Sequence, residues 1–115
     1  EARTIRDYLR KSSPPAGKPF YLVVGDFNDH RNSPALQRFL QVNDTPLTKL
    51  VPCEDSRGQR WTHHWAKADA YSRFDYILST PSLIEKLVPN SAKIFDGPES
   101  VLASDHRMIY ADFSF

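Results

Sequence analysis

The sequence of residues 20–29 is FYLVVGDFND, and it contains the strongest fold signal in the chain. Its first part, Phe20–Val24, is a continuous apolar run rich in residues that favour β-strands. Such a run is typical of a strand that is covered on both faces. Gly25 then lets the backbone turn closely, and Asp26 and Asn28 follow at the carboxyl end of the strand, where open α/β sheets collect ligands. The segment therefore predicts a buried strand that ends in a polar site.

Helices and strands are expected to alternate on both sides of this segment. Residues 1–11 have apolar side chains at helical spacing and predict an amphipathic helix, which ends at the breaker segment of residues 12–17. Ser33-Pro34 and Thr80-Pro81 each predict the start of a helix. Strands are expected over residues 61–65, 74–78, 92–95 and 108–115, an irregular segment over 43–54 and a turn over 67–72. The fold class is therefore expected to be α/β or α+β.

Length and composition indicate one ordinary globular domain. The 115 residues suffice for a modest core, and the net charge of +1 gives no overall field that would steer nucleic acid. No apolar run approaches the ~20 residues that a membrane-spanning helix needs, so no membrane span is expected. Cys53 is the single cysteine, which excludes an internal disulfide.

Asp75 is the most informative single residue, because it interrupts the apolar strand of residues 74–78. Aspartate is depleted in strands, and a buried carboxylate without a partner is costly. The partner is expected to be either a local group, such as Arg73 or a backbone amide, or His106 near the C-terminus. A carboxylate bound to one imidazole nitrogen fixes the tautomer and raises the basicity of the other nitrogen.

The remaining polar candidates each have an ordinary structural explanation as well as a functional one. Asp26 and Asn28 are typical turn residues, and Ser104 before Asp105 can act as a local cap. Histidines 63 and 64 are adjacent in a strand, with Trp61, His63 and Trp65 expected on one face and Thr62 and His64 on the other. They cannot form one spaced ligand pair, and with a single cysteine a zinc site made of histidine and cysteine is not expected.

Three segments, in this order, resemble the endonuclease/exonuclease/phosphatase superfamily. They are Gly25-Asp26-Phe27-Asn28, the strand centred on Asp75-Tyr76, and Ser104-Asp105-His106. This superfamily includes abasic-site endonucleases, secreted DNases, sphingomyelinases and inositol-polyphosphate phosphatases. The resemblance extends over essentially residues 1–115 as a single domain but corresponds only to the C-terminal half of that catalytic domain. It implies half of a two-sheet β-sandwich flanked by helices, completed by an N-terminal half of the same protein.

The resemblance also implies a role for each site residue. Asp26 would orient or deprotonate the attacking water, Asn28 would bind a phosphoryl oxygen, and Asp75 would hold His106 against the scissile phosphate. Asp105 would coordinate a divalent metal, and oxygen ligands favour Mg²⁺ or Mn²⁺. Less secure candidates that would border the substrate are Asp29, His30 and His64.

The sequence thus predicts a metal-dependent phosphoesterase whose substrate is a nucleic acid, a phospholipid headgroup or a sugar phosphate. Abasic-site endonucleases place an aromatic residue where this chain has Ser72, which argues against abasic DNA. The alternatives are a non-catalytic binding module of the same fold and a nucleic-acid-binding domain that uses arginines 57, 60, 73 and 107. The isolated chain is expected to be inactive and, because half a sandwich leaves apolar surface bare, to form a homodimer.

Overall fold

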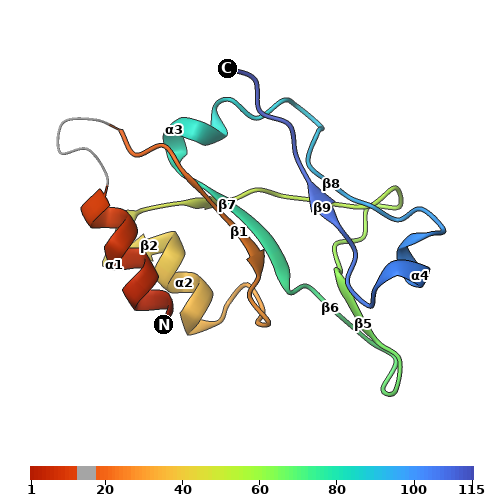
Figure 1. Cartoon of the computed structure of the whole chain (residues 1–115). Coiled ribbons are helices and arrows are strands. Elements are labelled where there is room, and N and C mark those ends of the chain that lie inside the picture. Colours follow the sequence, from red (N-terminus) through yellow and green to blue (C-terminus); the bar gives the residue numbers. More distant parts are fainter. Residues whose placement is uncertain (13–17) are drawn as a thin grey trace.

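Strand β7 (Asp75–Ser79) is the centre of the largest sheet in the computed structural model, which describes residues 1–12 and 18–115 (Figure 1). It pairs antiparallel with β1 (Leu22–Asp26) on one side and with β4 (Lys49–Leu50) on the other. The register sets Asp26 directly opposite Asp75. Two carboxylates that are far apart in sequence therefore lie at the same end of the sheet.

The other strands form three short antiparallel pairs. They are β2 (Gln41–Val42) with β3 (Thr45–Pro46), β5 (His63–Trp65) with β6 (Ala70–Ser72), and β8 (Lys93–Ile94) with β9 (Ile109–Tyr110). The helices are α1 (Ala2–Ser12), α2 (Pro34–Leu40), α3 (Pro81–Ile84) and α4 (Ser100–Ala103). The expected mixture of helices and strands is confirmed as a mixed α+β structure with small antiparallel sheets.

The core lies on both faces of β7, because successive side chains of a strand point to opposite faces. On one face, Tyr76 and Leu78 pack with Leu36 and Phe39 of α2. On the other face, Ile77 packs in a cluster with Val51, Cys53, Ala92 and Ile94. Both flanks of the central strand are thus filled, which fixes the position of Asp75 at its start.

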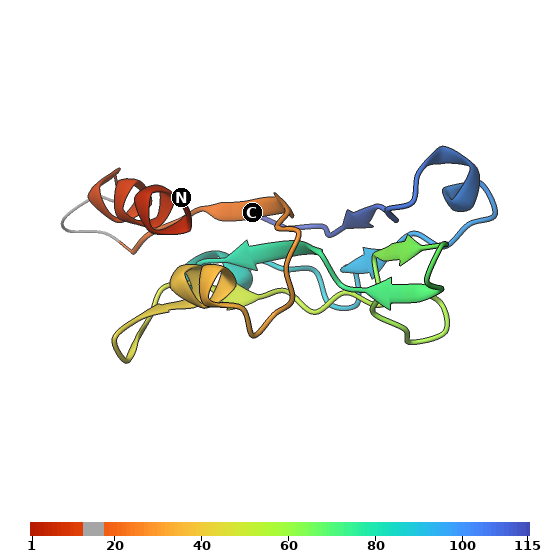
Figure 2. The same ribbon diagram turned by 90° about the horizontal axis from the view of Figure 1, so that it is seen from below.

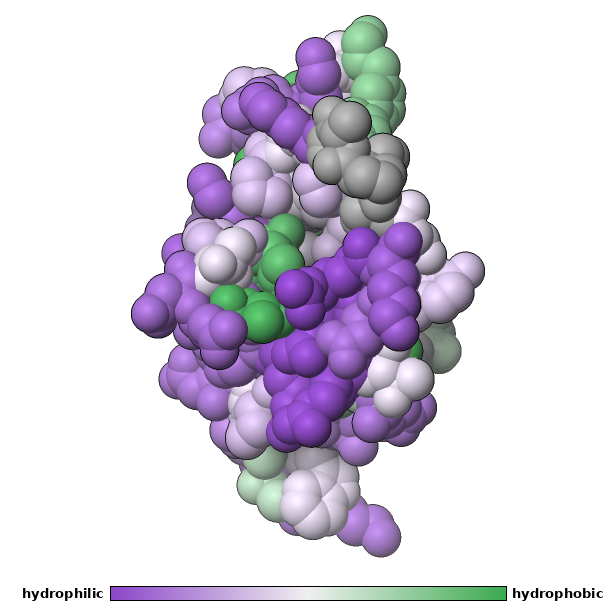
Figure 3. All heavy atoms as spheres, turned by 90° about the vertical axis from the view of Figure 1, so that its left-hand side faces the viewer, coloured by the Kyte–Doolittle hydropathy of each residue, from purple (hydrophilic) through white to green (hydrophobic). Residues whose placement is uncertain are grey.

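The molecule is elongated, with principal extents of 47 × 31 × 22 Å. Helices α1 and α2 lie at one end, and the β5–β6 hairpin and α4 lie at the other (Figures 1 and 2). The face at the α1 end is mostly hydrophilic, with a small hydrophobic patch (Figure 3). Among the described residues, none of the helices has the length and apolarity that a membrane crossing requires.

The start of α2 follows its sequence signal closely. The Ser33 side chain accepts a hydrogen bond from the Leu36 backbone amide at 3.2 Å, and Pro34 occupies the first helical position. The helix predicted before the breaker segment is also confirmed as α1. The break itself lies outside the described residues, apart from Ser12.

The prediction that the first strand is covered on both faces is wrong. Val23 packs into the cluster around α2, whereas Leu22 and Val24 on the opposite face are exposed. The reason is that no described element packs over the second face of β1.

Several short elements also differ from the expectation. The segment expected to be irregular contains β3 and β4, the expected turn contains β6, and α4 was not predicted. The last strand, expected over residues 108–115, is only Ile109–Tyr110. These elements have two to four residues each, and pairing with distant partners decides such elements more than their own sequence does.

Candidate functional site

The predicted pair of Asp75 and His106 is present. The Asp75 Oδ2 atom lies 2.8 Å from His106 Nδ1, within hydrogen-bonding distance. Both groups are partly buried, with 16% of the Asp75 side chain and 30% of the His106 side chain exposed. The hydrogen bond to Asp75 raises the pKa of the His106 imidazole; burial opposes the rise, and the negative charges of Asp75, Asp26 and Asp105 add to it. His106 therefore takes up a proton more readily than an isolated histidine.

The backbone around Asp75 is held by Thr62 and Arg73, which leaves its carboxylate available to His106. The fully buried Thr62 hydroxyl accepts hydrogen bonds from the Phe74 and Asp75 amides at 3.0 and 3.2 Å. Arg73 was the alternative partner of the carboxylate, but its Nε donates to the Asp75 backbone carbonyl at 2.7 Å. The geometry thus favours the histidine partner over the local one.

Asp26 faces the second nitrogen of the same imidazole. Its Oδ2 lies 3.8 Å from His106 Nε2, too far for a direct hydrogen bond but close enough for one small molecule to bridge them. Its Oδ1 accepts a hydrogen bond from the Asn28 backbone amide at 2.7 Å. Asn28 itself has a φ of 48°, in the left-handed region, and is exposed. The turn predicted for Asp26 and Asn28 is therefore present, and it also orients the Asp26 carboxylate toward the imidazole.

Asp105 and His106 sit in a segment that pairs with β5. His63 and His106 form an isolated antiparallel bridge, with hydrogen bonds from the His64 amide to the Asp105 carbonyl at 3.1 Å and from the Arg107 amide to the Thr62 carbonyl at 2.7 Å. Ser104 does act as a local cap, since its hydroxyl accepts a hydrogen bond from the His106 amide at 3.0 Å. Asp105 is left with 68% of its side chain exposed.

His63 is the site residue that sequence reasoning missed. Its Nε2 lies 3.3 Å from Asp105 Oδ2, its ring stacks on Phe74 at 5.3 Å, and its ring centroid is 4.7 Å from that of His106. The sequence did contain a signal, because adjacent side chains in a strand point to opposite faces, so either His63 or His64 could face the site. The pairing register brings His63 to the cluster, whereas the sequence singled out His64.

His64 is turned toward the β5–β6 hairpin. Its Nε2 lies 2.9 Å from Asp69 Oδ1, and its ring stacks on Tyr71 at 4.3 Å. Trp61 also contacts His64 and Tyr71. The expected shared face of Trp61 and His63 is therefore not formed, because β5 begins only at His63 and the alternation does not extend back to Trp61.

Asp29 and His30 lie in the loop after β1, and their hydrogen bonds involve groups other than the Asp75–His106 pair. The Asp29 carboxylate accepts a hydrogen bond from the His30 backbone amide at 3.0 Å. The Asp29 backbone carbonyl accepts a hydrogen bond from the Tyr76 hydroxyl at 3.0 Å. These contacts fix the loop, and they give neither side chain a link to His106.

A buried ion pair anchors the segment that carries His106. Arg107 Nη1 donates to Asp55 Oδ2 at 3.0 Å, and the guanidinium lies 3.5 Å from the centre of the Trp61 ring. Burial raises the pKa of the Asp55 carboxyl, but hydrogen bonds from the Gln59 amide, Arg107 and the Arg57 amide outweigh burial and keep that pKa below its usual value. Arg107 is therefore part of the interior rather than an exposed contact for nucleic acid.

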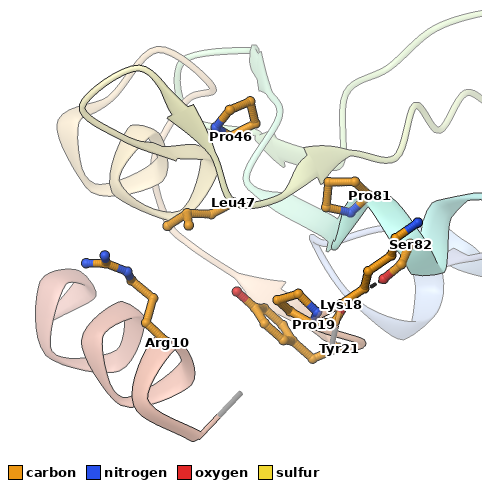
Figure 4. Close-up of a pocket in the computed structure, with 8 residues that line it drawn as sticks. All are labelled: Arg10, Lys18, Pro19, Tyr21, Pro46, Leu47, Pro81 and Ser82. Carbon is orange, nitrogen blue, oxygen red and sulfur yellow. Dashed lines mark hydrogen bonds between the residues drawn. The ribbon is translucent and has the colours of Figure 1, made fainter. Parts of the chain in front are cut away.

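Two cavities border the residues of the cluster. The Asp75–His106 pair borders one of about 490 Å³, whose other walls include Phe95, Ala103 and Met108. Asp105 borders a second of about 520 Å³, together with Trp61, His64 and Tyr71. A separate pocket of about 390 Å³ lies near the start of β1, away from the acids, between Arg10, Lys18 and Tyr21 (Figure 4). Open space thus borders the Asp75–His106 pair and, separately, Asp105.

Two sets of side chains could hold a metal ion among the described residues. One is Asp26, Asp75 and His106, and the other is His63, Asp105 and His106. In each set the possible ligand atoms lie within 4.8 Å of one another.

Comparisons of the chain with models of protein families, with curated proteins and with solved structures find no match.

Proposed function

We propose that this chain supplies the C-terminal half of the catalytic domain of a divalent-metal-dependent phosphoesterase. The observation that carries the proposal is the position of His106 between two carboxylates, with Asp75 on Nδ1 and Asp26 facing Nε2. Half of a two-sheet sandwich is the corresponding fold, and the exposed second face of β1 is consistent with it.

Asp75 prepares His106 to act as a base. With Nδ1–H donated to Asp75 Oδ2 at 2.8 Å, the lone pair of the neutral ring lies on Nε2. A water molecule held by Nε2 and Asp26 would lose its proton to the imidazole as its oxygen bonds to phosphorus. The ester P–O bond breaks in the same step, and the leaving group departs as an oxyanion that takes a proton from solvent. The proton taken up is stabilised by the hydrogen bond from the imidazole to Asp75.

Asp105 is the residue that would hold Mg²⁺ or Mn²⁺, because it combines an exposed carboxylate with proximity to His106. Magnesium is usually bound by one or two carboxylates together with substrate phosphates and water, so this donor fits part of such a site. When bound, the ion would neutralise charge that develops on the phosphate.

The nucleic-acid-binding alternative has weaker support. Arg107 is buried against Asp55 and Trp61, and Arg73 donates its hydrogen bonds to the backbone carbonyls of residues 53, 60 and 75. Two of the four arginines that would have contacted phosphates are therefore engaged within the protein. A non-catalytic module of this fold would have no need for a histidine held between two carboxylates.

The test is hydrolysis of bis(4-nitrophenyl) phosphate by the polypeptide that carries this chain together with the segment preceding it, with Mn²⁺ or Mg²⁺ and with excess chelator. We expect metal-dependent turnover that Asp26→Asn lowers by at least about 100-fold, the scale of lost acid–base catalysis. The matched control is Asp44→Asn, at an exposed carboxylate in the β2–β3 turn. Turnover by Asp26→Asn equal to that of the control would contradict the proposal.

A further inference from the structure

The cluster contains an imidazole that the proposed hydrolysis does not use. His63 lies beside Asp105 and His106, and one ligand atom from each of the three residues lies within 4.8 Å of the others. His63 is 17% exposed and Asp105 is 68% exposed, so the histidine is held by the protein while the carboxylate faces solvent. This is a two-histidine, one-carboxylate set with an open side.

The strand pairing brings the two imidazoles together. The hydrogen bonds next to the His63–His106 bridge join the residues on either side of it, from the His64 amide to Asp105 and from the Arg107 amide to Thr62. His63 and His106 are therefore a non-hydrogen-bonded pair, the antiparallel arrangement in which opposite side chains approach most closely. Their ring centroids are 4.7 Å apart.

The spacing of the ligand atoms suits a small tetrahedral ion. Two ligands bound at ~2.0–2.1 Å around a tetrahedral centre are about 3.3–3.4 Å apart. His63 Nε2 and Asp105 Oδ2 are 3.3 Å apart. The site thus requires little movement of these two groups to accept an ion between them.

The ring of His106 is also oriented as metal-bound imidazoles usually are, and the ring of His63 is held by packing. Metal-bound histidines commonly donate their second ring N–H to a carboxylate, and Asp75 accepts this bond from His106 Nδ1 at 2.8 Å. Stacking on Phe74 at an interplanar angle of 28° fixes the ring of His63. The second-shell hydrogen bond of His106 is therefore already formed, and packing limits the movement of His63.

We propose that His63, Asp105 and His106 form a binding site for a transition-metal ion of the Zn²⁺ class. Two imidazole nitrogens and one carboxylate favour such an ion over Mg²⁺, which prefers oxygen ligands. Three protein ligands leave a fourth position open to water or to another ligand. The site depends on the His63–His106 pairing, which brings together residues 43 positions apart.

This site has a consequence that rests on the proposed function. An ion on His106 Nε2 occupies the lone pair that would accept the proton of water, and it also takes the Asp105 carboxylate away from Mg²⁺ or Mn²⁺. Zn²⁺ would therefore inhibit the proposed hydrolysis by competing at the same side chains.

The test measures binding without reference to activity. Purified protein is titrated with Zn²⁺ in a calorimeter and with Co²⁺ followed by visible absorption, which reports tetrahedral coordination. We expect one ion per chain, and at least about 100-fold weaker binding in His63→Phe, which keeps an aromatic ring against Phe74 but has no ligand atom. The matched control is His64→Phe, at the adjacent histidine that pairs with Asp69, and it should bind as the wild type does.

Asp105→Asn is the second variant, and because this side chain is exposed, the substitution should leave folding unchanged. Binding by His63→Phe or Asp105→Asn equal to the wild type, or no stoichiometric binding at millimolar metal, would overturn the site. Zinc inhibition that is relieved by His63→Phe would support the competition. If no hydrolysis is found while the binding pattern holds, the proposed function fails and the metal site stands.

Discussion

Removing the carboxylate of Asp55 tests whether the buried ion pair holds the segment that carries His106. Asp55 and Arg107 are 2% and 6% exposed, and Oδ2 and Nη1 are 3.0 Å apart. Asp55 Oδ1 also accepts hydrogen bonds from the Arg57 and Gln59 amides, at 2.8 Å each. Asp55→Ala would therefore leave a buried guanidinium and two backbone amides without their acceptor.

Breaking a buried ion pair by removing one partner costs about 3–5 kcal/mol, because the remaining charge is uncompensated. This cost is a large part of the ~5–15 kcal/mol that stabilises a typical domain. With a urea m value of about 2 kcal/mol per M, the unfolding midpoint should fall by about 1.5–2.5 M. The double variant Asp55→Leu/Arg107→Met should recover part of the loss, because it removes the uncompensated charge as well.

The assay is urea unfolding followed by far-UV circular dichroism and by tryptophan fluorescence. Trp61 stacks on Arg107, so its fluorescence also reports the local environment. The matched control is Asp96→Ala, which removes an exposed carboxylate bound to Ser56 in the same region and should change the midpoint little. A midpoint for Asp55→Ala equal to that of the control would refute the role assigned to the ion pair.

Four further predictions concern the site and the exposed sheet face. Asp75→Asn should lower the pKa of His106, measured by NMR titration of its ring protons, because the folded-state pKa is raised chiefly by the hydrogen bond to Asp75; an unchanged titration would contradict this. For the same reason, the stability that His106 contributes should be complete below its unfolded pKa of about 6.5 and be lost as pH rises through the folded-state value. The chain alone should bind Mg²⁺ weakly and hydrolyse bis(4-nitrophenyl) phosphate negligibly, since Asp105 offers only one open carboxylate, and robust turnover would show that no further half is needed. The exposed apolar face of β1, with Leu22 and Val24, should make the chain dimerise, and light scattering that gives a monomer mass at micromolar concentration would contradict this.

The sequence could predict the site residues that lie at strand ends and the carboxylate whose burial requires a partner. Asp75, predicted inside an apolar strand and found at the start of β7, had to find a partner, and the hydrogen bond to His106 confirms the one suggested by the family resemblance. Asp26 is the last residue of β1, which proved to pair with β7, so it lies at the same end of the sheet. Each of these signals is local, since it depends on one strand and the residue at its end.

The missed features depend on partners that are distant in sequence. The approach of His63 depends on the register between residues 62–64 and 105–107, which the buried Arg107–Asp55 pair helps to fix. The exposure of Val24 depends on what packs over that face of the sheet, which an apolar run alone cannot specify. Both are properties of tertiary packing, and a pattern within one segment contains no information about them.

The most direct test of the central claim is kcat for His106→Ala compared with His64→Ala. It is measured with bis(4-nitrophenyl) phosphate and Mn²⁺ in a polypeptide that includes the proposed N-terminal half. Both variants replace a histidine with alanine. His106 is held between Asp75 and Asp26, whereas His64 is paired with Asp69. If His106 is the base, His106→Ala should lower kcat by at least about 100-fold, and His64→Ala should leave it close to the wild-type value. A kcat for His106→Ala close to that of the wild type would contradict the mechanism.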